Sequence, residues 1–245
     1  MKKTLFLAVL GASALTASAV TITSGSYIGS GGAGTGQSLA GDRFRSFQPT
    51  GADENYLGVP NLGTAGNRVA RQLNWMTDAN NPLTSFDFTF QYDQANDKLV
   101  STIFGGSLEY TGWSTKLAGL GKTKGAADLN AFQFSVKQGD IGSLVYLTDV
   151  VLDGTALGSF LGVDGVTKDW LVTGSDMNLT DGFTLTGKLW LKGPFSSSQE
   201  NSAVNLAAGW DSRGVRPSVP DGGTTLVLLG GALTGLAALR RKLVA

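Results

Sequence analysis

The run from Ser85 to Tyr92 constrains the fold of this chain more than any other stretch. Its sequence, Ser-Phe-Asp-Phe-Thr-Phe-Gln-Tyr, alternates strictly between polar and aromatic residues. Successive side chains of a β-strand point to opposite faces, so a period of two predicts a half-buried strand and argues against a helix. We expect Phe86, Phe88, Phe90 and Tyr92 to point into a core.

The same alternation returns further along the chain. Residues 131–137, 183–191 and 204–210 alternate in this way, and residues 144–152 are rich in β-branched and aromatic side chains. The loop 93–97 has the length of a hairpin connection, with further strands expected at 98–104 and 107–111 and one short helix within 112–128. These short alternating strands predict an all-β domain, a mainly antiparallel β-sandwich of the jelly-roll or immunoglobulin type.

The segment before this series contains much glycine and little periodicity. Residues 20–41 open with a β-prone piece, 20–23, and are then rich in Gly and Ser, which favour loop or flexible chain. Residues 42–68 look irregular, and only 69–76 suggest a short strand or helical turn. We therefore expect an N-terminal arm over 20–41, the sandwich over 42–210 and a short polar stalk over 211–218.

The N-terminus has the three parts of a secretory signal peptide. Lys2 and Lys3 supply the positive region, residues 5–15 are apolar, and Ala17 and Ala19 form a small-x-small cleavage site. We predict removal of residues 1–19 and a mature chain that begins at Val20. The alternative, an uncleaved anchor, is disfavoured because the apolar part is too short to span a bilayer.

The C-terminus carries an apolar run that ends in three cations. Residues 224–239 contain no charge and are followed by Arg240, Arg241 and Lys242, which are costly to translocate and stay in the cytoplasm as a stop-transfer signal. A helix of 16 residues spans about 24 Å, less than the roughly 30 Å of a hydrocarbon core. This length favours a temporary hold in the membrane, with an ordinary tail anchor as the alternative.

A short motif stands immediately before the apolar run and consists of Val219, Pro220, Asp221, Gly222 and Gly223. Together with the apolar helix and the basic end, residues 219–245 resemble the PEP-CTERM class of sorting signals in its Val-Pro-Asp variant. The resemblance implies that the motif is recognised by an exosortase, a membrane-embedded protease. It further implies a Gram-negative precursor held in the inner membrane and a product released or attached at the cell surface, often with exopolysaccharide.

The residue types narrow the chemistry. The chain contains no His and no Cys, which excludes Ser-His-Asp and Cys-His catalysis, His-ligated zinc and thiolate metal sites. We therefore expect a non-enzymatic protein without a cofactor, although a glycosidase needs only two carboxylates. Without the two processing segments the chain keeps 14 basic and 18 acidic residues, a charge near −4 that does not suit nucleic acid.

Several acidic residues fall in expected turns, where calcium is the metal that they would suit, although no calcium-loop spacing is present. They are Asp149, Asp153, Asp164, Asp169 and Asp181. Asp in a turn more commonly serves a backbone hydrogen bond.

Trp190 is a candidate sugar-stacking residue. It alternates with Leu189 and Leu191 and therefore faces away from the core, where an amphipathic aromatic could bind a sugar ring. The alternatives are that a loop covers it or that a bulge near Gly187 turns it inward. Two function classes stay open: a non-enzymatic surface or matrix protein, and a carbohydrate-binding or carbohydrate-acting sandwich domain.

Overall fold

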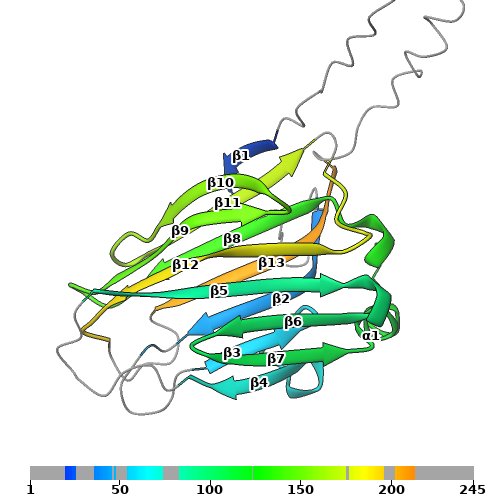
Figure 1. Ribbon diagram of the computed structural model, residues 1–245, viewed down its shortest axis with the longest axis horizontal. Helices are drawn as coiled ribbons and strands as arrows, with labels where there is room; N and C mark the ends of the chain where they lie inside the picture. Colours follow the sequence, from blue (N-terminus) through cyan, green and yellow to red (C-terminus); the bar gives the residue numbers. More distant parts are fainter. Residues whose placement is uncertain are drawn as a thin grey trace, which may run out of the picture.

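The computed structural model describes residues 20–25, 36–45, 47, 54–73, 83–122, 124–174, 177–195 and 202–212. Their strands form two antiparallel sheets that lie face to face in a sandwich-like arrangement (Figure 1). The expected all-β, mainly antiparallel architecture is confirmed.

The seven-stranded sheet has its two N-terminal strands in very different positions, one at the edge and one inside. Its order is β1 (Val20–Ser24), β11 (Val166–Gly174), β8 (Ala131–Gln138), β13 (Ala203–Asp211), β2 (Gly36–Arg45), β3 (Glu54–Gly58) and β4 (Arg68–Gln72). A 3-10 turn, Ala65–Asn67, precedes β4.

The six-stranded sheet contains the strands that the alternating pattern predicts best. Its order is β10 (Thr155–Leu161), β9 (Leu144–Leu152), β12 (Phe183–Lys192), β5 (Thr84–Asp93), β6 (Lys98–Ile103) and β7 (Gly106–Thr111). The short helix expected within 112–128 is α1, Trp113–Gly119, and two 3-10 turns cover Gln94–Asn96 and Ala126–Asp128.

Phenylalanine side chains join the two sheets. Phe88 and Phe90 are buried as the alternation predicts, and the ring of Phe90 lies edge-on to Phe132 and Phe183 with centroid distances of 5.9 and 5.1 Å. Such edge-to-face pairs stabilise by about 0.5–1.5 kcal/mol beyond the area that they bury. Phe132 belongs to β8 of the seven-stranded sheet, so its contact with Phe90 of β5 joins the two sheets, whereas Phe183 of β12 lies in the same sheet as Phe90.

The expectation of an arm over 20–41 is wrong for its two ends. Val20–Ser24 pairs with β11, and Gly36–Arg45 lies between β13 and β3 inside the sheet. Glycine here serves close packing, since a Cβ atom on Gly36 would clash with the carbonyl oxygen of Trp210. Residues 26–35 of the expected arm lie outside the described residues.

The expectation that residues 42–68 are irregular is also wrong. Strand β2 continues to Arg45, and Glu54–Gly58 pairs on both sides, with β2 and with β4. Of the short strand or helical turn suggested at 69–76, the strand is observed, as β4, Arg68–Gln72, and residues 74–76 lie outside the described residues. β3 is short and four of its five residues are buried, so it shows no alternation that a sequence pattern would reveal.

Both ends of the domain lie at one end of the sandwich, which we call the tail pole. Val20 pairs with Gly174 of β11, and Asp211 pairs with Gly36 of β2. Thr173 and Gly209 both pair with Ala131 of β8, so the start of β1 and the end of β13 are at the same level (Figure 1).

Candidate functional site

The residues of the two processing signals lie outside the part of the chain that the structure describes. They are Ala17 and Ala19 of the cleavage site, Val219, Pro220, Asp221, Gly222 and Gly223 of the motif, and Arg240, Arg241 and Lys242 of the basic end. The apolar run 224–239 lies outside it too, and among the described residues no helix is long and apolar enough to cross a membrane. What the structure does place is the tail pole, where β1 begins at Val20 and β13 ends at Asp211.

At the tail pole the last strand is clamped to its neighbour. The backbone N–H of Asp211 donates to Asn130 Oδ1 at 2.8 Å, and Asn130 Nδ2 donates to the Asp211 carbonyl oxygen at 3.1 Å. Asp211 is fully buried, so the stalk does not begin at residue 211 as expected. The described part of the domain extends to Ser212, a short distance in sequence before the motif that starts at Val219.

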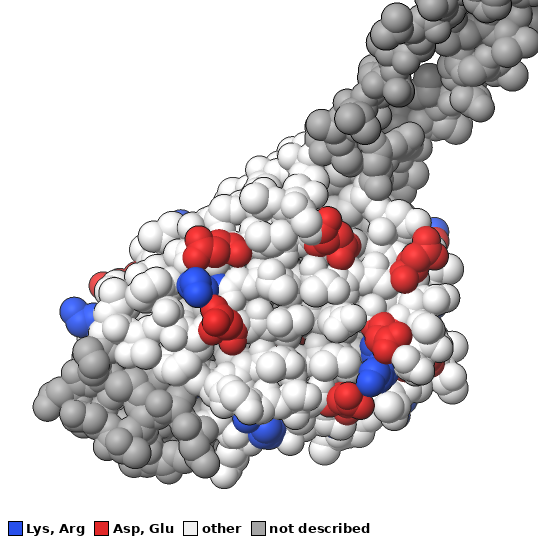
Figure 2. Space-filling view, viewed as in Figure 1, with Lys and Arg blue, Asp and Glu red and all other residues white. Residues whose placement is uncertain are grey.

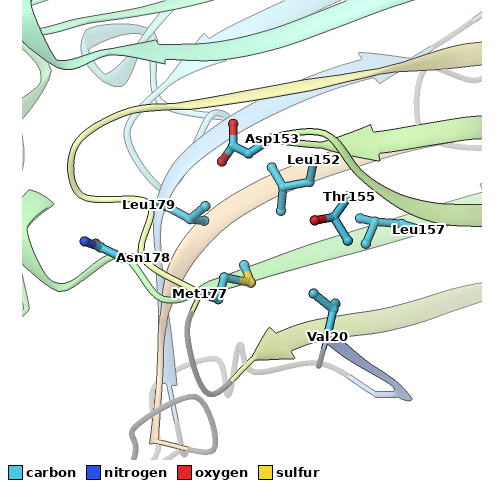
Figure 3. Close-up of a pocket in the computed structure, with 8 residues that line it drawn as sticks. All are labelled: Val20, Leu152, Asp153, Thr155, Leu157, Met177, Asn178 and Leu179. Carbon is cyan, nitrogen blue, oxygen red and sulfur yellow. The ribbon is translucent and has the colours of Figure 1, made fainter. Parts of the chain in front are cut away.

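A pocket opens at the same pole, between β1, the β9–β10 hairpin and the segment 177–179 (Figure 3). Its lining is mainly apolar and comprises Val20, Leu152, Asp153, Thr155, Leu157, Met177, Asn178 and Leu179. These residues come from separate segments, so no local pattern in the sequence predicts them. The lining offers one carboxyl group, that of Asp153, and no second acid to pair with it.

The five acidic residues expected in turns are spread over the sandwich. Asp153 and Gly154 form the tight β9–β10 turn with φ angles of +47° and +81°, and the Thr184 N–H donates to Asp153 Oδ1 at 2.7 Å. Burial raises the pKa of Asp153, and this backbone hydrogen bond lowers it in part. Asp164 accepts from Gln138, and Asp169 from Ser135.

Within the described ranges, no three acidic side chains come together as a set of metal ligands. Figure 2 shows the charged side chains of one face scattered among uncharged ones. The expectation that all five acids lie in turns is wrong for Asp169, which lies within β11. The hydrogen bonds of Asp153, Asp164 and Asp169 join segments that are distant in the sequence, so these carboxylates link neighbouring parts of the sandwich.

Trp190 lies on the outer face of the six-stranded sheet, opposite the fully buried Leu189 and Leu191. Its indole ring is parallel to the Tyr146 ring within 8°, with centroids 5.8 Å apart, and its Nε1 donates to Thr148 Oγ1 at 2.8 Å. The side chain is part-buried by these neighbours. The orientation that the alternation predicts is therefore the one observed.

A bulge does lie beside Gly187, but its extra residue belongs to the neighbouring strand. Thr186 pairs with Val151 and Lys188 with Thr148, so three residue steps on β9 face two on β12. Asp149 takes up the difference with a φ of +53°, a conformation that Asp tolerates better than most residues. Because β12 itself stays regular, the bulge does not turn Trp190 into the core.

Trp190 and Tyr146 belong to a line of cross-strand neighbours that we call the aromatic row: Leu161, Tyr146, Trp190 and Ser85. Leu161 is 58% exposed at one end of this row. The next pair along the strands is ionic, with Lys188 Nζ 2.8 Å from Asp87 Oδ1. The Asp87 carboxylate raises the pKa of Lys188.

A cluster of three hydrogen-bonded polar side chains, which the sequence did not predict, lies inside the sandwich. Asn55 Nδ2 donates to Asp42 Oδ1 at 2.6 Å, and Ser101 Oγ donates to Asn55 Oδ1 at 3.3 Å, all three side chains being fully buried. Burial raises the pKa of Asp42 to about 7, and hydrogen bonds and the charge of Arg71 lower it only in part. Because all three side chains are closed off from solvent, we assign the cluster to the core.

Comparison with known protein families identifies a motif in the tail. Residues 218–243 match the VPDSG-CTERM motif, a PEP-CTERM-like family of sorting signals. No curated protein matches the chain significantly. The fold and the tail together define a sandwich-like β protein with a C-terminal sorting signal, which supports an exported protein at the cell surface or outside the cell.

Proposed function

We propose that this chain is the precursor of a non-enzymatic surface or extracellular-matrix protein that signal peptidase and an exosortase-type protease process at its two ends. The observation that carries the proposal is the sorting-signal match at 218–243, which begins shortly after the last strand ends at Asp211. In this proposal the motif 219–223 is recognised, the run 224–239 holds the precursor in the inner membrane, and the cations 240–242 set its orientation.

The arrangement of the two ends supports this route. β1 begins at Val20, the first residue after the expected cleavage, and β13 ends at Asp211 of the same pole. A precursor with both ends at the membrane can therefore fold its sandwich on one side, since neither terminal segment has to cross the domain.

The absence of His and Cys from the sequence supports a non-enzymatic role. The hydrogen bonds of Asp153, Asp164 and Asp169 to other segments of the sandwich support a structural role for these acids. We propose neither a cofactor nor a calcium site.

A second candidate function is carbohydrate binding, with exopolysaccharide as the partner. The observation that favours it is the parallel pair of Trp190 and Tyr146 on an outer sheet face. Amphipathic rings of this kind bury an apolar face while their polar atoms keep hydrogen bonds.

The test of the sorting route is a pair of tail variants expressed in the organism that encodes the chain. Pro220→Ala with Asp221→Ala should leave membrane insertion intact, because neither residue lies in the apolar run, but should strand an uncleaved precursor in the membrane. The matched control, Pro217→Ala, changes a proline just outside the motif and should be processed normally. Deletion of 224–245 should give a soluble exported protein, and normal processing of the double variant would refute recognition of the motif.

A further inference from the structure

Trp190 is partly exposed on the outer face of its sheet, and its two cross-strand neighbours differ in size. In the sheet register its two cross-strand neighbours are Tyr146 on β9 and Ser85 on β5. Tyr146 stacks on the indole, whereas the Ser85 side chain is too small to cover a bicyclic ring. Within the aromatic row, the ring of Trp190 therefore lies next to the small hydroxyl group of Ser85.

The indole is also held in place before any ligand arrives. Its Nε1 donates to Thr148 Oγ1 at 2.8 Å, and the neighbouring Tyr146 ring restricts its rotation. A side chain that is already ordered loses little conformational entropy on binding. The indole of Trp190 is therefore suited to stack on the flat face of a ligand.

Two lysines flank Trp190 along β12, and only one of them is paired with a carboxylate among the described residues. Lys188 and Lys192 flank it on the same face of β12, each about 7 Å along the strand. Lys188 is neutralised by Asp87 at 2.8 Å. Lys192 is exposed, its cross-strand neighbour is the apolar Leu144, and within the described residues it has no carboxylate partner.

We propose that this face binds a carboxylate-bearing polysaccharide. Trp190, supported by Tyr146, stacks on the sugar rings, and Lys192 pairs with the carboxylate of the same or the adjacent sugar. The inference rests on the second candidate function above and gives its ligand a chemical class. An exposed Lys–carboxylate pair is weak and screened by salt, so tight retention depends on many copies of the sugar along one polymer.

The test is affinity electrophoresis of the processed exported chain in gels that contain polygalacturonate, with dextran gels as the neutral comparison. The wild-type chain should be retarded by polygalacturonate and much less by dextran. Trp190→Ala should weaken retention about tenfold, as loss of a stacked ring does. Trp190→Phe should restore most of it.

Lys192→Gln should lose most of the retention in polygalacturonate, and about 0.5 M salt should do the same to the wild-type chain. The matched control is Lys168→Gln, which changes an exposed lysine of β11 in the other sheet and should behave as wild type. No retardation of the wild-type chain, or equal retention of Trp190→Ala, would overturn the site.

Equal retention of Lys192→Gln, or equal retardation in dextran, would overturn the assignment of the carboxylate. The same variants should be processed normally at the tail. Failure of sugar binding would therefore leave the sorting proposal standing, and failure of processing would be seen separately.

Discussion

The side-chain amide of Asn55 donates a hydrogen bond to Asp42 Oδ1 at 2.6 Å, deep between the two sheets. Asp42 lies on β2, Asn55 on β3 and Ser101 on β6 of the facing sheet, so the cluster links the layers with polar contacts. A carboxyl group in such a place favours its protonated form, because desolvation penalises the charge.

The first prediction is that Asp42 makes stability depend on pH. Its pKa is about 7 in the folded state against 3.8 ordinarily, so between these values the folded protein binds a proton that the unfolded chain does not. The contribution of Asp42 to the free energy of unfolding is fully present below about pH 4 and is lost as the pH rises through 7. The total change is at most about 4 kcal/mol. Urea unfolding at several pH values measures it.

The variant Asp42→Asn should remove this part of the pH dependence and should be relatively more stable at alkaline pH. Asp181→Asn, an exposed acid in the loop before β12, is the control and should follow the wild-type curve. Parallel curves for the wild type and Asp42→Asn would contradict a raised pKa at this position.

The second prediction concerns the start of α1. Its N-cap residue is Gly112, which has no side chain, and Asp97 supplies the missing acceptor by binding the Ser114 N–H at 2.9 Å and the Ser114 hydroxyl at 2.7 Å. Asp97→Ala should therefore lower the free energy of unfolding by about 1–2 kcal/mol. Ser114→Ala keeps the backbone bond and should cost less, and an equal loss in both variants would show that the cap is not the cause.

The sequence predicted the strands whose two faces differ. The runs at 85–92 and 183–191 became β5 and β12, whose buried positions alternate with more exposed ones. The run at 131–137 became β8, which is buried on both faces and was located by the alternation of its sequence alone. β2 was missed because all ten of its positions, Gly36–Arg45, are partly or fully buried, so that no exposed position marks a period of two. Its glycines also resemble those of a loop. An interior strand packed on both faces need not alternate in sequence, and β2 does not.

The candidate site was predicted only in part, because a local pattern gives the face of a strand on which a residue lies but not its neighbours on other strands. The alternation around Trp190 gives its face, since Leu189 and Leu191 define the buried side. The neighbours Tyr146, Ser85 and Thr148 depend on the register of three strands and on the bulge at Asp149. Such pairings between distant segments cannot be obtained from a single local pattern.

The third prediction is the N-terminus of the exported chain. Cleavage after Ala19 leaves Val20 as both the first residue of the mature protein and the first residue of β1, so no strand residue is lost. N-terminal sequencing should read Val-Thr-Ile. A sequence that starts at Met1 would contradict signal peptide removal.

The measurement that tests the central claim most directly is the intact mass of the wild-type chain in each cell fraction of the organism that encodes it. The sorting account predicts that the form at the surface or in the medium lacks the apolar run 224–239 and the C-terminal Ala245, while only an inner-membrane precursor retains them. A chain that keeps Ala245 at steady state and stays in the inner membrane would contradict the account and would make the tail a permanent anchor.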